Sequence, residues 1–143
     1  MKNYLKYILL GIVFWAVVDF TTTGAIRNPA GYYLTYMPAL LIFYIGYPLI
    51  FSLLIYKFRL SNRWLFLAAL VGAFVVEVVF TQNALLFTFP IMLLAIPLAV
   101  SIYSFLTFVP KWIIEKNIKD KKWKTIVLTA IWVLLSIITF ISN

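Results

Sequence analysis

The chain has no cysteine and no histidine, and only four of its 143 residues are acidic. Without cysteine it forms no disulfide and offers no thiolate nucleophile. Without histidine it has neither a His-based catalytic triad nor the usual ligands of zinc, copper and haem. Four acids are also too few for an acidic site that holds several metal ions. We therefore expect no metal and no cofactor, and most familiar catalytic chemistry is excluded.

Apolar residues, in contrast, are abundant. Hydrophobic residues make up 65% of the chain, charged residues only 11%, and the mean hydropathy is +1.05. An ordinary soluble domain is about 45–50% apolar and about 25% charged. The composition therefore predicts an all-α integral membrane protein.

Charged residues divide the chain into five apolar segments. A crossing needs about 20 residues, because the hydrocarbon layer is about 30 Å thick and a helix rises about 1.5 Å per residue. Pro90 and Pro97 each remove a backbone donor from the fourth segment, which predicts a kinked helix or, alternatively, a partly re-entrant segment. We expect residues 1–143 to form one five-helix transmembrane bundle, with spans at 7–26, 37–56, 64–83, 84–109 and 125–142.

The basic residues predict the orientation of this bundle. Short cytoplasmic loops retain lysine and arginine. If the N-terminus is cytoplasmic, eleven of the twelve basic residues lie on the cytoplasmic side and only Arg27 lies outside. We therefore expect a multi-pass protein of the cell membrane with its N-terminus in the cytoplasm and its C-terminus outside.

The loop 111–124 carries six lysines but only two acids, Glu115 and Asp120. Anionic lipid headgroups attract such a segment by about 1 kcal/mol per basic residue, whereas nucleic acid would need a larger surface. The predicted partners are thus membrane lipids, with anionic headgroups at this loop, and no nucleic acid. Trp112, Trp123 and Tyr103 are expected in an aromatic belt at the same interface.

Asp19 and Glu77 are the acids that lie inside predicted spans. An ionisable group there costs about 2.5–3.5 kcal/mol on insertion scales and marks a candidate functional site. Both are expected at similar depths in the outer half of the bundle, with Arg27 as a bidentate partner. They are the candidate catalytic residues, with the catalytic role itself unknown. The candidate binding residues in the same half are Arg27, Thr23, Gln82, Asn83, Trp15 and Phe80.

Three kinds of function remain open. The first is binding or permeation of a cation, a proton or a small solute, by a homo-oligomer or together with a partner membrane subunit, because five thin helices enclose little volume. The second is a membrane enzyme in which the two carboxyls perform acid catalysis on a lipid or isoprenoid. The third is a non-catalytic structural or assembly subunit, in which Asp19, Glu77 and Arg27 form a buried ion-pair network.

Overall fold

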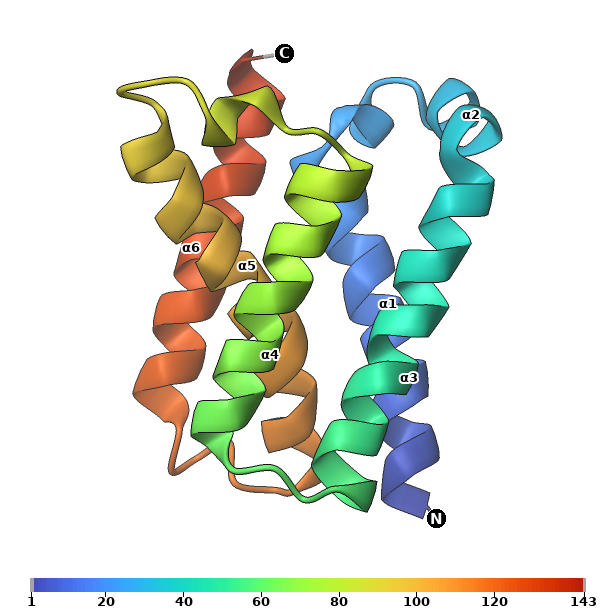
Figure 1. Ribbon diagram of the computed structural model, residues 1–143, viewed down its shortest axis with the longest axis vertical. Helices are drawn as coiled ribbons and strands as arrows, with labels where there is room; N and C mark the ends of the chain where they lie inside the picture. The colour runs from blue at the N-terminus through green and yellow to red at the C-terminus, as the bar shows by residue number, and fades with distance from the viewer. Residues whose placement is uncertain (1, 143) are drawn as a thin grey trace.

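The computed structural model describes residues 2–142 and is all-helical. Helices account for 84% of it, and the described part contains no strand. Five helical segments are long and apolar enough to cross a membrane, which confirms the predicted class of a multi-pass membrane protein. These segments run side by side along the long axis of the molecule (Figure 1).

The first span is α1, Lys2–Thr22, and the 3-10 turn η1, Gly24–Ile26, follows it. The second span, Pro29–Lys57, alternates α-helical and π-helical segments: α2 Pro29–Leu41, η2 Ile42–Gly46, α3 Tyr47–Ser52 and η3 Leu53–Lys57. The third span combines α4, Asn62–Phe74, with the π-helical η4, Val75–Phe80. After the 3-10 turn η5, Ala84–Leu86, come α5, Met92–Ile114, and α6, Lys122–Ser142.

The fourth span begins later than the sequence predicted. Residues 84–91 form the short turn η5 and an irregular stretch across one end of the bundle, and the helix itself starts at Met92 (Figure 1). Pro90 explains the shift, because proline disfavours the helical conformation in the residue before it. The span regains its length at the other end, where α5 continues past Val109 to Ile114.

Helix α5 is the central element, packing against α1, α4 and α6. The Tyr7 hydroxyl donates to the Thr107 carbonyl at 3.0 Å, and the Tyr47 and Thr107 hydroxyls lie 2.8 Å apart. These bonds join α1 and α3 to α5 inside the core. Helices α1 and α3 also approach closely, because a Cβ added at Gly11 would lie 2.7 Å from the Cβ of Pro48.

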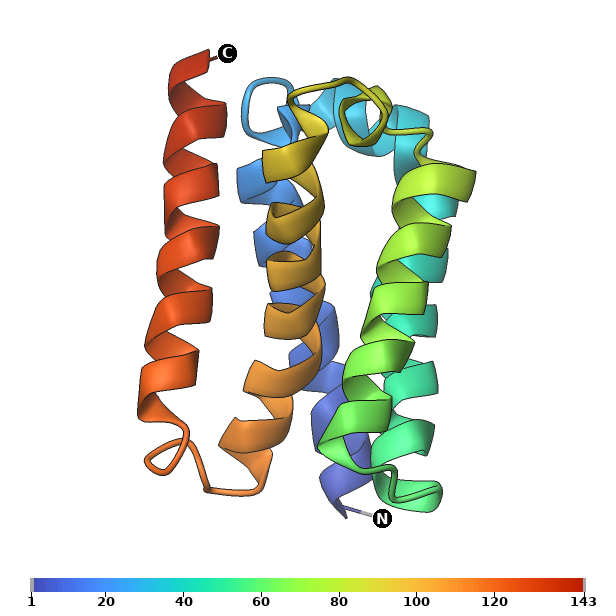
Figure 2. The same cartoon turned by 60° about the vertical axis from the view of Figure 1, so that its left-hand side comes forward.

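Helix α6 stands at the edge of the bundle (Figure 2). It packs on α5 and α1, where the Trp132 indole N–H donates to the Thr21 hydroxyl at 3.0 Å and the Trp132 ring stacks on Phe105 at 5.3 Å. Beyond the lysines of its first turn, most of the exposed side chains of α6 are apolar, which suits contact with lipid chains.

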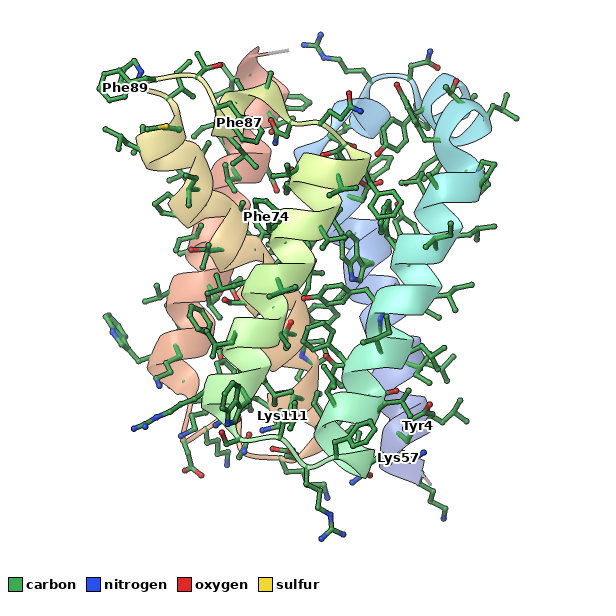
Figure 3. All side chains as sticks on the ribbon, in the orientation of Figure 1. Tyr4, Lys57, Phe74, Phe87, Phe89 and Lys111 are labelled. Atoms are coloured by element: carbon green, nitrogen blue, oxygen red, sulfur yellow. The ribbon has the colours of Figure 1, made fainter. Side chains whose placement is uncertain are left out.

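The two ends of the bundle differ in charge. The N-terminus and the loops 58–61 and 115–121 lie at one end, where Figure 3 labels Lys57 and Lys111. We call this the Lys-rich end. The C-terminus and the loops 23–28 and 81–91 lie at the opposite end, where Figure 3 labels Phe87 and Phe89. We call it the Arg27 end.

Candidate functional site

Asp19 is held by two tyrosines of the second span. It lies on α1, three residues before the helix ends at Thr22, and is 9% exposed. The Tyr44 hydroxyl donates to Asp19 Oδ2 at 2.6 Å. The Tyr32 hydroxyl lies 3.0 Å from Oδ1 and 3.1 Å from Oδ2. Four oxygens, two from the carboxyl group and two from the phenols, therefore converge at this point.

Glu77 occupies the corresponding position at the end of the third span, three residues before Phe80, and is half-buried. The Tyr103 hydroxyl donates to Oε1 at 3.0 Å, and the Asn83 side-chain amide donates to Oε2 at 2.9 Å. Tyr103 comes from the middle of α5 and is only 3% exposed. Asp19 and Glu77 therefore lie at matching positions near the Arg27 end, each bonded to a tyrosine from another span.

The backbone explains how Asn83 reaches Glu77. The π-helical η4 ends at Phe80, and Gln82 then adopts a left-handed conformation with φ of 49°. This conformation reverses the chain, and the Asn83 N–H donates to the Glu77 carbonyl at 2.8 Å, in the manner of a helix C-terminal cap. The same turn brings the Asn83 side chain beside the Glu77 carboxyl group.

Trp15 connects the two carboxyl sites through its ring. Tyr44, the partner of Asp19, packs on Trp15 with ring centroids 6.3 Å apart, and Tyr103, the partner of Glu77, packs edge-on at 5.7 Å. No hydrogen bond joins the two carboxyl groups directly within residues 2–142. The Trp15 indole N–H is buried and has no acceptor in the described chain. Asp19 and Glu77 are thus connected to one aromatic cluster through their tyrosine partners.

Neither carboxyl group has a basic partner within residues 2–142. The ion pair found in the described part of the chain joins Lys111 to Glu115 at 3.6 Å, at the Lys-rich end. Arg27 is exposed and lies five residues beyond the end of α1. The predicted pairing of Arg27 with Asp19 or Glu77 does not occur. Water solvates the guanidinium group where it lies, whereas a buried pair would carry a desolvation penalty.

The other predicted binding residues lie nearby but do not bond to the carboxyl groups. The Thr23 hydroxyl donates to the main-chain carbonyl of Asp19 at 2.6 Å. Phe80 is exposed and packs edge-on against Phe43 at 5.2 Å. Gln82 is exposed and serves the helix end described above. Of the predicted binding set, Asn83 bonds to a carboxyl group and Trp15 joins the cluster between them.

Sequence reasoning placed Tyr32 at the level of the two acids but missed the other two tyrosines that hold them, Tyr44 and Tyr103. The assignment of Tyr103 to an interfacial belt was wrong, because α5 runs from 92 to 114 and places this residue at its midpoint. Tyr44 lies in a span without any charge, and no pattern separates it from the other eight tyrosines. Buried tyrosines need a hydrogen-bond partner, so an acid at a matching depth was the available signal.

The site at Asp19 and Glu77 is built from carboxyl groups, tyrosine hydroxyls and one side-chain amide. It offers carboxyl and phenol oxygens, and no group of three or more His, Cys, Asp or Glu side chains able to hold a metal ion occurs among the described residues. No protein-family model, curated protein or solved structure matches the chain. The function is therefore argued from the site itself.

Proposed function

We propose that the protein binds a proton or a small monovalent cation at Asp19 and Glu77. We propose further that this binding is a step in the passage of that ion across the membrane. The observation that carries the proposal is the charge balance of the site. Two acids are embedded in the bundle, and every hydrogen-bond donor found on their carboxyl groups is neutral: Tyr32, Tyr44, Tyr103 and Asn83.

Neutral donors stabilise a carboxylate but do not cancel its charge. An uncompensated charge within a span costs about 2.5–3.5 kcal/mol on insertion scales. Because Arg27 remains in solvent, the compensating charge has to come from outside the chain. Each carboxyl group balances a single positive charge, which favours a proton or a monovalent ion over a divalent one.

The position of the acids gives such an ion a short path. Asp19 and Glu77 each lie three residues, about 4.5 Å, from the ends of their helices at the Arg27 end. An ion from the water on that side has to pass only one helical turn to reach them. The tyrosine hydroxyls that bond to the acids remain available as further oxygen ligands.

The proposal includes the arrangement of the protein in its membrane. We place the Lys-rich end in the cytoplasm and the Arg27 end outside the cell, following the distribution of basic residues. Anionic headgroups lie against the loop 111–124. We also expect Pro97, which lies inside α5 and lacks an N–H group, to bend this helix. Five helices enclose little space, so the ion path runs between protomers or along a partner subunit.

The test compares ion flux in liposomes that contain the purified protein. Asp19→Asn and Glu77→Gln preserve shape but remove the ionisable group, and each is expected to reduce proton or monovalent-cation flux at least about tenfold. The matched controls Asp120→Asn and Glu115→Gln make the same chemical changes at the Lys-rich end and should retain the flux. Thermal stability in detergent is measured for every variant.

Two results would overturn the proposal. One is a wild-type protein whose liposomes show neither flux nor ion binding above protein-free liposomes. The other is an Asp19→Asn or Glu77→Gln variant that melts early and yet keeps full flux per folded molecule. Either result leaves the two acids with a structural role.

A structural subunit is the second candidate, and one observation favours it. Asp19 joins α1 to the second span through Tyr32 and Tyr44, and Glu77 joins the third span to α5 through Tyr103. Polar bonds of this kind hold membrane helices together. In that case the amide variants change stability and assembly, and the liposomes show no flux.

A further inference from the structure

A cavity of about 510 Å³ lies at the Lys-rich end, away from the two acids. Its walls come from α4, α5 and α6, and α4 and α6 both pack on α5. Figure 2 shows α5 standing between the other two helices. On α5 the lining residues Ser104, Phe108 and Trp112 are four residues apart and share one face of the helix. The cavity thus extends about 12 Å along α5.

The lining changes from basic to apolar with distance from the end of the bundle. On α4, Arg63 at the rim is followed by Phe66 one turn deeper. On α6, Lys124 is followed by Leu128. Helix α5 runs in the opposite direction and places Phe108 deeper than Trp112. The α4 and α6 walls therefore offer positive charge at the surface, where α5 offers Trp112, and below this level the lining is apolar apart from Ser104.

The basic groups at the rim have no acidic partner among the residues that the structure describes. Lys121 and Lys124 line the cavity together with Arg63, and no acid is among the lining residues. None of the three bases forms an ion pair within the described chain, where Glu115 is bonded to Lys111 instead. Trp123, also on the rim, is 75% exposed. Amphipathic tryptophans of this kind favour the level of the lipid headgroups.

We propose that this cavity binds one anionic phospholipid. The phosphate group lies against Arg63, Lys121 and Lys124, and the first part of an acyl chain lies against Phe66, Phe108 and Leu128. A soluble anion would contact the three bases but not the apolar side chains deeper in the cavity. An uncharged lipid would leave the three positive charges unpaired. The inference depends only on the Lys-rich end and is independent of the function proposed for Asp19 and Glu77.

Native mass spectrometry of the protein in neutral detergent, titrated with phosphatidylglycerol, tests the charge requirement. Lys121→Gln combined with Lys124→Gln is expected to weaken binding about 30-fold, because each base near an anionic group contributes about a factor of five. The matched control combines Lys116→Gln with Lys119→Gln, which removes the same charge from the same loop but outside the cavity. It should weaken binding by less than about threefold.

A second pair of variants tests the acyl-chain contact. Val127→Trp fills the cavity while leaving the three bases in place, and Val133→Trp makes the same change at an exposed position of α6 away from it. We expect only Val127→Trp to reduce phosphatidylglycerol binding, and we expect inorganic phosphate not to displace the lipid. Both variants sit on exposed positions, so folding should be retained.

Three outcomes would overturn the inference. Equal losses in the two double-lysine variants would show that only the overall charge of the loop matters. Full displacement by inorganic phosphate, with no effect of Val127→Trp, would show a site for free anions. Phosphatidylcholine that binds as tightly as phosphatidylglycerol would remove the role of the three bases.

Discussion

The hydrogen bond from Tyr44 to Asp19 allows the charge of the acid to be tested through stability. At 2.6 Å it falls within the range of O–H···O⁻ bonds, whereas the contacts from Tyr32 are 3.0 and 3.1 Å long. A bond to a charged acceptor contributes about 1.5–3 kcal/mol to folding, and a bond between neutral groups about 0.5–1.5 kcal/mol. Tyr44→Phe removes the hydroxyl group and keeps the ring that packs on Trp15.

We expect Tyr44→Phe to lower the free energy of unfolding by about 1.5–3 kcal/mol. Tyr32→Phe should lower it by less, because the contacts of Tyr32 with the same carboxyl group are longer. Tyr36→Phe is the matched control, because Tyr36 lies on the same span with its side chain 53% exposed. It should change stability by less than about 0.5 kcal/mol. Reversible unfolding by sodium dodecyl sulfate in mixed micelles measures all three values.

A double-mutant cycle with Asp19→Asn assigns the loss to the pair. If the bond to a carboxylate is the cause, Tyr44→Phe costs clearly less in the Asp19→Asn background than in the wild type. A loss for Tyr44→Phe no larger than that for Tyr36→Phe, or one that Asp19→Asn leaves unchanged, would refute the reasoning.

Three further predictions concern packing, backbone and orientation. Gly11→Ala should lower stability by about 1–3 kcal/mol, because its Cβ would lie 2.7 Å from a proline carbon, whereas at Gly46 the nearest atom is 4.0 Å away and alanine should be tolerated. Lys116→Gly should raise the free energy of unfolding by about 1 kcal/mol, because Lys116 has a φ of 56°, a left-handed conformation that glycine adopts without strain. An unchanged or lower melting temperature would contradict this prediction. Since the chain has no native cysteine, single cysteines at Ala30 and Lys119 report orientation, and only the one at Ala30 should react with an impermeant reagent in intact cells. Labelling at Lys119 would reverse the orientation.

The number and class of the spans followed from the sequence because length and hydropathy are enough to set them. The boundaries of the spans were predicted less accurately, because hydropathy does not take account of the capping residues and prolines that set where a helix begins. The second span starts at Pro29 rather than residue 37, with Pro29 in the first turn and the Asn28 side chain accepting from the Gly31 N–H at 3.0 Å. These signals are visible in the sequence, as is the effect of Pro90 on the fourth span.

The acids at the candidate site could also be found from the sequence, since a charge within a span stands out. The tyrosines that bond to these acids could not be identified in this way. Whether Tyr44 or Tyr36 faces Asp19 depends on how two helices are rotated about their axes, and this rotation is set by packing across the whole bundle. Arg27 was predicted to pair with the acids because it is positively charged and was expected on the same side of the membrane. It lies beyond the end of α1, however, and is exposed to solvent.

The central claim is that Asp19 and Glu77 receive their compensating positive charge from the solution. Infrared difference spectroscopy of the protein in liposomes tests this most directly, because it separates the carboxyl from the carboxylate band while the external pH or the Na⁺ and K⁺ concentrations are changed. We expect bands that respond to at least one of these changes and disappear in Asp19→Asn and Glu77→Gln, but persist in Asp120→Asn. Bands of the two acids that stay constant under every condition would contradict the account.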